Sequence, residues 1–269
     1  MSTAMELFNA GDLAGAIEAV NGEIRSQPNN VEARALLVEL LCFSGDLERA
    51  DKQLNTMLSL DPQTAFTVGT WRQLIRAAQT RNDVFEQGAT PSVIDTPTKV
   101  ISNALAILLA ARTGESDNVQ ALIDENDTQS AQLEWVINEE EATLLRDADD
   151  VLGGITELLG SNGKYFWVDN AQIESLEFAE ITRPLELLWR PVDIALSNGT
   201  HGQAFLPAIY HGSSDDADVG YSLGKKTDWV ETNGVVRGKG LRQWLVNDEL
   251  LSAYDFKEIS NAKSEALVS

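Results

Sequence analysis

The stretch FNAGDLAGAI at residues 8–17 returns 34 residues later as CFSGDLERAD at residues 42–51. Both copies contain Gly-Asp-Leu, and the correspondence extends to Leu7 and Leu41, Ala16 and Ala50, Val20 and Leu54, Ile24 and Leu58, and Pro28 and Pro62. A period of 34 residues is typical of tetratricopeptide helix pairs. The sequence therefore predicts two helix–turn–helix repeats within residues 1–64.

Each repeated residue has a role in such a helix pair. The glycine of the tripeptide allows a sharp turn, because it carries no Cβ atom. The following aspartate is expected to cap the second helix at its N-terminus. The small alanine lets the two helices approach closely, and the proline ends the second helix.

The chain is strongly acidic, with a net charge of −22 over 269 residues. Such a charge repels phosphate backbones, so nucleic acid is excluded as an expected partner. No apolar run of about 18 residues exists that could span a membrane. Met1–Ala10 lacks the basic start and apolar core of a signal peptide, and Cys42 is the lone cysteine. Both features predict a cytoplasmic protein.

The acidic residues are unevenly distributed. Residues 115–150 contain 12 acidic residues and one basic residue, Arg146. Such a run is usually a solvated helix face, and less often a docking surface for a basic partner. Both interpretations stay open at this point.

Further helices are predicted before residue 150. Residues 65–87 show near-helical apolar spacing, and residues 88–97 contain the glycine and prolines of a connecting loop. A looser third pair is predicted over residues 103–123, with Gly114 at the turn. Residues 131–148 are predicted to form one more helix, with Leu133, Val136, Ile137 and Leu144 on one face.

The pattern changes near Asp150 to short alternating runs that are broken by Asn-Gly pairs. These pairs lie at 162–163, 198–199 and 233–234, where a type I′ turn would join two strands. Residues 151–259 are therefore predicted to form an antiparallel β domain, either a barrel or a strongly bent sheet, and the last ten residues to be frayed. The expected fold is α+β, with a helical domain at 1–150 and a β-rich domain with a polar tail at 151–269.

Known catalytic and cofactor motifs are missing. The stretch GYSLGKKT at 220–227 imitates a phosphate-binding loop, but three residues instead of four separate its glycines and Lys226 replaces Ser or Thr. His201 and His211 are too far apart for a helical zinc pair. No enzyme activity, cofactor or metal is expected.

Four motifs resemble the C-terminal half of the ImpE (SciE-type) family, also called TagJ. They are Leu188-Trp189-Arg190-Pro191, Leu206-Pro207-Ala208-x-Tyr210, Thr227-Asp228-Trp229 and Arg237-Gly238-x-Gly240. The order of helical repeats and β-rich end also follows that family. These residues have no assigned role, and a structural interpretation places them in the core and turns of the β domain.

The resemblance implies an adaptor of bacterial type VI secretion. Such a protein would bind the N-terminal helix of the small sheath subunit and be linked to ClpV, the unfoldase that recycles contracted sheath. The alternatives are a helical-repeat scaffold with another partner, and an enzyme whose site lies near Trp189, Arg190, Asp228 and Arg237. The sequence does not give the oligomeric state.

Tetratricopeptide geometry predicts the partner-binding groove. The first helix of each pair lines the concave face, and this face is expected to contain Ser2, Glu6, Asn9, Glu32, Ala35, Glu39, Cys42 and Phe43. The set contains no cation, so a clamp for a peptide's C-terminal carboxylate is excluded. The sequence predicts instead that Phe43 anchors an amphipathic helix with basic flanks and that Glu39 attracts it.

Overall fold

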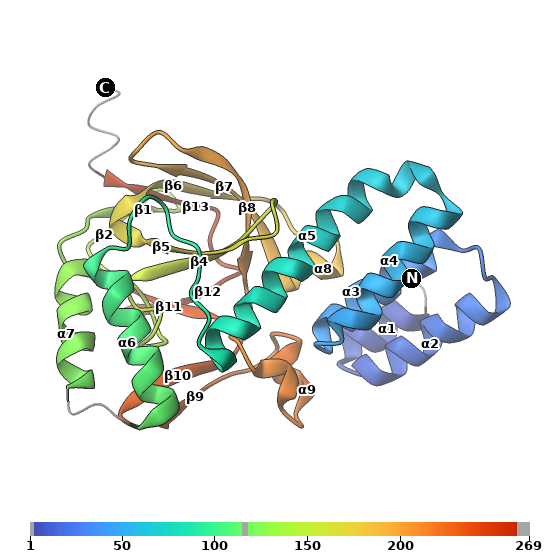
Figure 1. The fold of residues 1–269 in the computed structure, drawn as a ribbon, viewed down its shortest axis with the longest axis horizontal. Coiled ribbons are helices and arrows are strands. Elements are labelled where there is room, and N and C mark those ends of the chain that lie inside the picture. The colour runs from blue at the N-terminus through green and yellow to red at the C-terminus, as the bar shows by residue number, and fades with distance from the viewer. Residues whose placement is uncertain (1–2, 115–117, 263–269) are drawn as a thin grey trace.

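The computed structural model describes residues 3–114 and 118–262. A helical arm projects from one side of a β-sheet body, and the two parts meet along a long helix, α5 (Figure 1). No helix within the described residues is both long and apolar enough to span a membrane.

The arm consists of the two predicted helix pairs. Its helices are α1 (Thr3–Ala10), α2 (Leu13–Ser26), α3 (Val31–Phe43) and α4 (Leu47–Leu60). Gly11 and Gly45 adopt positive φ angles of 93° and 72° at the turns. The carboxylates of Asp12 and Asp46 accept hydrogen bonds from the first turns of α2 and α4, at 2.8 and 3.2 Å. The sequence prediction for this region is confirmed.

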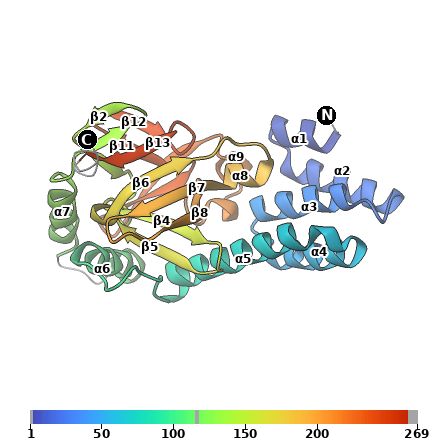
Figure 2. The same ribbon diagram turned by 90° about the horizontal axis from the view of Figure 1, so that it is seen from above.

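Three more helices follow the arm in the chain, and the first of them, α5, connects it to the body. A short 3₁₀ turn, η1 (Pro62–Thr64), leads into α5 (Ala65–Asn82), and α5 ends in a π-helical turn, η2 (Asp83–Gln87). α6 (Lys99–Thr113) and α7 (Val119–Ser130) form the predicted third pair, and Gly114 takes the left-handed conformation at the end of α6. Figure 2 shows α6 and α7 at the end of the body that is opposite to the arm.

The body is built from antiparallel strands. The largest sheet has the order β2-β1-β13-β6-β7-β8-β4-β5, and smaller sheets have the orders β12-β11-β3 and β10-β9. The strands are β1 (Trp135–Ile137), β2 (Glu140–Ala142), β3 (Leu145–Asp147), β4 (Ile155–Gly160), β5 (Tyr165–Asp169), β6 (Ile173–Phe178), β7 (Trp189–Leu196), β8 (His201–Pro207), β9 (Thr227–Thr232), β10 (Val235–Gly240), β11 (Gln243–Val246), β12 (Glu249–Ser252) and β13 (Glu258–Asn261). The α+β class is confirmed. The large sheet is open rather than closed into a barrel, because its two edge strands, β2 and β5, do not pair with each other.

Short helical segments lie between some of these strands. They are η3 (Asn170–Gln172), α8 (Pro184–Leu188), η4 (Ser213–Asp215) and α9 (Val219–Ser222). α8 reaches back to the arm, where it packs against α3, and Ser214 of η4 lies close to Gly45 at the turn between α3 and α4. The β half of the chain therefore covers a surface of α3 that would be exposed in the repeat region alone.

The helix predicted for residues 131–148 is wrong. This segment forms β1, β2 and β3, and positive φ angles at Asn138 and Glu139 make the tight turn between the first two. β1 pairs with β13, more than a hundred residues later in the chain, as in the register Trp135↔Asn261. Long-range pairing of Trp135-Val136-Ile137 therefore overrides the local helical period.

Only one of the three predicted type I′ turns has that conformation. Asn233 and Gly234 both have positive φ angles, 55° and 75°, between β9 and β10. At the other two Asn-Gly pairs only Gly163 and Gly199 are positive, at 81° and 84°. In both of those loops the glycine N–H donates to the carbonyl three residues earlier, which is the three-residue hairpin that ends in a glycine bulge.

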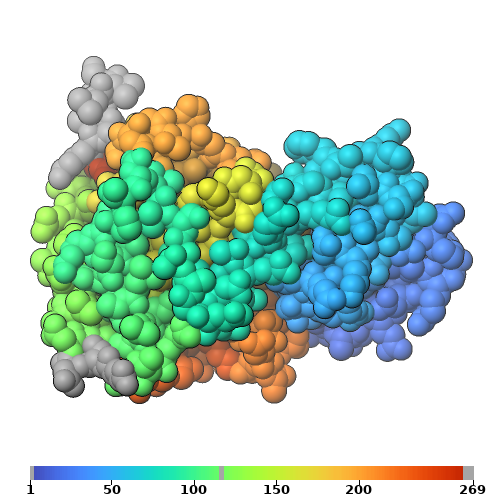
Figure 3. All heavy atoms as spheres, in the orientation of Figure 1, coloured from blue at the N-terminus to red at the C-terminus, as the bar shows by residue number. Residues whose placement is uncertain are grey.

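One hydrophobic core runs through both the arm and the body. It contains Phe8 and Phe43 of the arm, Trp71 of α5, and Trp167 and Trp189 of the large sheet. The space-filling view shows the arm packed directly against the rest of the molecule on the visible face (Figure 3). A second core lies among β1, β6, β11 and the residues around Phe256. The division at residue 150 stays a prediction.

Candidate functional site

A buried network of charged side chains joins the arm to the body. Arg81, on α5, donates to both carboxylate oxygens of Glu157 on β4, at 2.8 and 2.6 Å. Arg242 donates to Glu157 at 3.0 Å and to Asp147 at 2.5 Å. The side chains of Glu157, Asp147 and Arg242 have no exposed surface, and that of Arg81 is 10% exposed.

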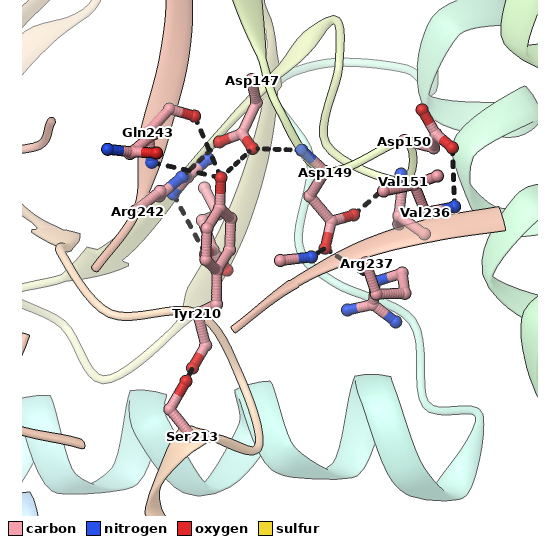
Figure 4. Close-up of polar contacts among 12 residues, drawn as sticks. Asp147, Asp149, Asp150, Val151, Tyr210, Ser213, Val236, Arg237, Arg242 and Gln243 are labelled. Atoms are coloured by element: carbon pink, nitrogen blue, oxygen red, sulfur yellow. Dashed lines mark hydrogen bonds and ion pairs between the residues drawn. The ribbon is translucent and has the colours of Figure 1, made fainter. Parts of the chain in front are cut away.

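Polar groups of the body extend this network. Tyr165 donates its hydroxyl to Glu157 at 2.5 Å, and the Trp167 indole donates to that hydroxyl at 2.7 Å. The Tyr210 hydroxyl lies 2.9 Å from Asp147, and Figure 4 shows how the tyrosine ring points into the cluster from below. These bonds hold the carboxylates in fixed orientations.

A third buried carboxylate, that of Asp149, supports the strand β10. Asp149 accepts hydrogen bonds from Arg237 Nε at 2.7 Å and from the backbone N–H of Gly238 at 2.9 Å (Figure 4). The neighbouring Asp150 accepts from the backbone N–H of Val236 at 2.7 Å. Part of the acidic run at 115–150 is therefore internal, which corrects its interpretation as one solvated helix face.

The charges in the network compensate one another. Burial disfavours ionised Glu157, but the attraction of Arg81 and Arg242 is stronger and lowers the pKa of its carboxyl. Burial likewise disfavours the Arg242 guanidinium, and Asp147 and Glu157 nevertheless raise its pKa. Burial is the largest effect on Asp147 and raises the pKa of its carboxyl, although Arg242 lowers it in part. The network is structural, because its buried side chains are held by one another in fixed positions.

The described residues contain no cluster of three or more His, Cys, Asp or Glu side chains that could hold a metal ion. Cys42 is buried, and burial raises the pKa of its thiol, so the reactive thiolate is disfavoured. In the stretch 220–227, Lys226 pairs with Asp218. The absence of ATP binding stays a prediction.

Most residues of the four family motifs are buried in the body of the protein. The buried members are Trp189, Arg190, Pro191, Leu206, Pro207, Tyr210, Gly238 and Gly240. Arg190 donates to the carbonyl of Ala253 at 2.5 Å and lies over the Phe178 ring. A Cβ atom at Gly238 would overlap the Tyr210 ring, so glycine is needed there for close packing. Asp228 and Trp229 differ from the rest, because both are exposed on β9.

The predicted concave groove is largely filled by the protein itself. Glu39 accepts hydrogen bonds from Arg183 Nε at 2.7 Å and from the backbone N–H of Leu185 at 3.2 Å, at the start of α8. Phe43 is 1% exposed and packs edge-on against Phe8, with ring centroids 5.1 Å apart. The α8 segment returns from the β half to cover α3.

This contact corrects the prediction for half of the groove residues. Ala35, Glu39, Cys42 and Phe43 are buried and do not face a partner, whereas Glu6, Asn9 and Glu32 are exposed. Burial raises the pKa of Glu39 despite the neighbouring Arg183, so Glu39 is an internal group rather than a surface charge. Ser2 lies outside the described residues. Partner binding by the exposed members stays a prediction.

A groove of about 250 Å³ lies beside this contact, between α5, α8 and the strands β7 and β8. One wall is formed by residues of α5, and the other by residues of α8, β7 and β8 and by Arg183. The lining residues are Phe66, Thr67, Thr70, Trp71, Leu74, Arg183, Leu185, Glu186, Trp189, Pro191, Gln203 and Phe205. Phe66 is 86% exposed, and the Arg183 guanidinium lies 4.3 Å from the centroid of the Trp71 ring.

Comparison with known proteins gives a consistent relationship over the whole chain. Residues 139–260 match the family described as ImpE protein, and residues 7–66 match the tetratricopeptide repeat. The type VI secretion system accessory component TagJ of Pseudomonas aeruginosa is 30% identical over 263 residues, which cover 98% of this chain and 92% of that protein. This chain belongs to the ImpE/TagJ family.

A solved structure agrees with this assignment. The crystal structure of protein VPA1032 from Vibrio parahaemolyticus superimposes with a TM-score of 0.87 at 30% identity. The match covers 98% of this chain and 99% of that chain. The arrangement of arm and body is therefore shared with this second protein.

Sequence motifs did not identify the residues of the buried charge network of this ImpE/TagJ protein. Arg81, Glu157 and Arg242 belong to none of the predicted sites, and they lie far apart in the chain. One signal was present for Glu157, because it is the one charged residue in the mostly apolar stretch ITELLG at 155–160, which forms a strand with all six positions buried. A charged residue in such a strand requires a buried partner of opposite charge.

His211 lies next to the network and predicts a measurable pH dependence. Its ring stacks on Phe85 with centroids 4.7 Å apart, and its Nε2 is 3.2 Å from a Glu86 carboxylate oxygen. Burial, followed by the charges of Arg81 and Arg237, lowers its pKa to about 3. Glu86 would favour a protonated ring, but its side chain is 53% exposed and screened by water, so the neutral form prevails.

We expect stability to fall as the pH is lowered from about 7 to about 5. The folded state keeps His211 neutral, whereas in the unfolded chain this histidine takes up a proton near pH 6.5. The free energy of unfolding therefore falls by at most about 1.4 kcal/mol for each pH unit below that value. Urea unfolding at about pH 7, 6 and 5 should show a smaller slope for His211→Gln than for the parent. His201→Gln, at an exposed position, is the control and should keep the parent slope. An unchanged slope in His211→Gln would contradict this assignment.

Proposed function

We propose that this protein is a non-catalytic, cytoplasmic adaptor of a type VI secretion system. It binds the N-terminal helix of the small sheath subunit and links that subunit to a ClpV-type unfoldase. The observation that carries this proposal is the 30% identity to a type VI accessory component over 98% of the chain. The compensated charge network supports a binding role, because it offers no poised acid, base or nucleophile.

The groove between α5 and α8 is the best-suited place for such a helix. An amphipathic helix binds by laying its apolar face into an apolar groove, with anchors at helical spacing. On the α5 wall, Phe66, Thr70 and Leu74 are four residues apart and therefore lie on one face of that helix. An exposed phenylalanine at the rim of a groove is a typical anchor for a partner, because its burial removes a large apolar area from water.

Phe66→Ala should weaken binding of the small sheath subunit's N-terminal peptide by more than tenfold. The expected loss corresponds to more than about 1.4 kcal/mol, a typical value for an anchor residue. The measurement is calorimetric titration of the whole chain with that peptide. Leu109→Ala is a matched control, because Leu109 is also exposed, at 56%, but lies on α6 and outside the groove.

Two results would separate the function from its location. If the peptide does not bind the parent protein at all, the adaptor function is contradicted for this partner. If the peptide binds both variants equally well, the function stands but the groove is the wrong surface. In that case the exposed members of the predicted face, Glu6, Asn9 and Glu32, become the next residues to replace.

A further inference from the structure

The strand β9 is an open sheet edge. It pairs with β10 along one side, in the register from Thr227↔Gly240 to Thr232↔Val235. Within residues 3–114 and 118–262, no strand pairs with its other side. Five of its six residues are exposed and Thr227 is half-buried, so the outer edge is accessible to solvent.

The turn geometry determines which backbone groups face outward. In a two-residue type I′ hairpin, the residues that flank the turn form a hydrogen-bonded pair, and pairs then alternate along the ladder. Thr232, Val230 and Asp228 therefore bond to β10, and Glu231 and Trp229 direct their N–H and C=O groups outward. In agreement with this, the Trp229 N–H is taken by the Asp228 carboxylate at 2.9 Å.

The hairpin is held rigidly from behind. The Asn233 side chain donates to the carbonyl of Ala111 at the end of α6, at 2.9 Å. Asp149 binds Arg237 and Gly238 of β10, at 2.7 and 2.9 Å. An edge that is fixed before binding loses little conformational entropy when a second strand is added.

Two usual protections of a sheet edge, proline and lysine, are missing from β9. Its sequence, TDWVET, contains no proline and no lysine, and Trp229 and Val230 are 38% and 49% exposed. Asp228 and Glu231 are its two charged residues, and both are acidic. Pairing of two copies along this edge would bring carboxylates together in a chain of net charge −22. A second copy is therefore disfavoured.

We infer that β9 is a docking edge to which an extended, basic segment of a partner protein adds as a further strand. The outward groups of Glu231 supply main-chain hydrogen bonds, and the neighbouring side chains Trp229 and Val230 supply apolar contacts. Asp228 lies directly across from Lys239, which offsets its charge. Within residues 3–114 and 118–262 the Glu231 carboxylate forms no ion pair, and it is the group that receives the partner's cation.

The test uses the whole chain and a blocked heptapeptide of alternating lysine and valine as the probe. Glu231→Pro removes the outward N–H while the bonds to β10 are kept, and it should weaken binding at least tenfold. Glu231→Gln keeps the N–H and removes only the charge, so it should weaken binding less and reduce its salt dependence. A thermal melt of each variant checks that the fold is retained.

A second probe keeps the test decisive if Glu231→Pro does not fold. The same heptapeptide with alternate amides N-methylated cannot form the ladder, and it should fail to bind the parent protein. Amide NMR shifts of the parent with the unmodified peptide should concentrate on residues 227–232. Equal affinity for Glu231→Pro, binding of the methylated peptide, absence of binding to the parent, or dimerisation of the parent through β9 would each overturn the inference.

Discussion

Glu157→Gln should lower the free energy of unfolding by about 3–5 kcal/mol, because it breaks a buried ion pair and leaves one partner uncompensated. The change is nearly isosteric, so the loss would reflect charge rather than packing. Glu157 is the carboxylate between two guanidiniums, those of Arg81 and Arg242. After the substitution Arg242 still pairs with Asp147, whereas Arg81 loses its carboxylate partner. Urea unfolding at neutral pH measures the effect.

Two further variants distinguish this explanation from a general sensitivity to substitution. Glu48→Gln removes an equally close but exposed pair, with Lys52 at 2.6 Å, and should change stability by less than about 1 kcal/mol. The double variant Arg81→Met/Glu157→Met removes one charge of each sign and leaves the Arg242–Asp147 pair balanced. The double variant should therefore recover much of the unfolding free energy that the loss of Glu157 alone removes. If its destabilisation equals the sum of those of Arg81→Met and Glu157→Met, this would contradict the charge-balance argument.

The same pair fixes how the arm is attached. Arg81 belongs to the helix that continues the arm, and its guanidinium also donates to the carbonyl of Ile209 in the body, at 3.1 Å. Loss of Glu157 would therefore weaken the junction between the two halves as well as the core.

The helical half was predictable because its signals are local. The turn glycines, the capping carboxylates of Asp12 and Asp46 and the prolines act within one repeat, and the structure uses each as expected. The hairpins β4–β5 and β9–β10 were predictable for the same reason, since their turns join neighbouring strands. The α+β class followed from the order of these two patterns.

The start of the sheet and the functional surfaces were not predictable from local pattern. β1 becomes a strand because it pairs with β13, and the carboxylates of residues 139–141 around its turn suit a helix surface as well as an exposed turn. The sequence predicts that the concave face of the repeats is open to a partner. However, sequence could not show that α8, from a segment 140 residues later, would cover α3 through Arg183 and Glu39.

Phe43→Ala should destabilise the protein by about 3–5 kcal/mol, the range for removing a buried phenylalanine ring. The reason is that Phe43 is 1% exposed, contacts Phe8 edge-on and belongs to the core that joins the arm to the body. The sequence-based prediction had placed this ring in an open groove, where its loss would leave stability unchanged. Urea unfolding of the purified variant distinguishes the two positions.

Phe66→Ala is the matched control for this change, because it removes the same ring from a surface position that is 86% exposed. It should alter stability by less than about 0.5 kcal/mol, as expected for a surface substitution, while lowering affinity for the sheath peptide. The opposite pattern would have a specific meaning. If Phe43→Ala kept the parent stability and lost the peptide, α8 would have to leave the concave face on binding, and the contact between Glu39 and Arg183 would be the one that the partner displaces.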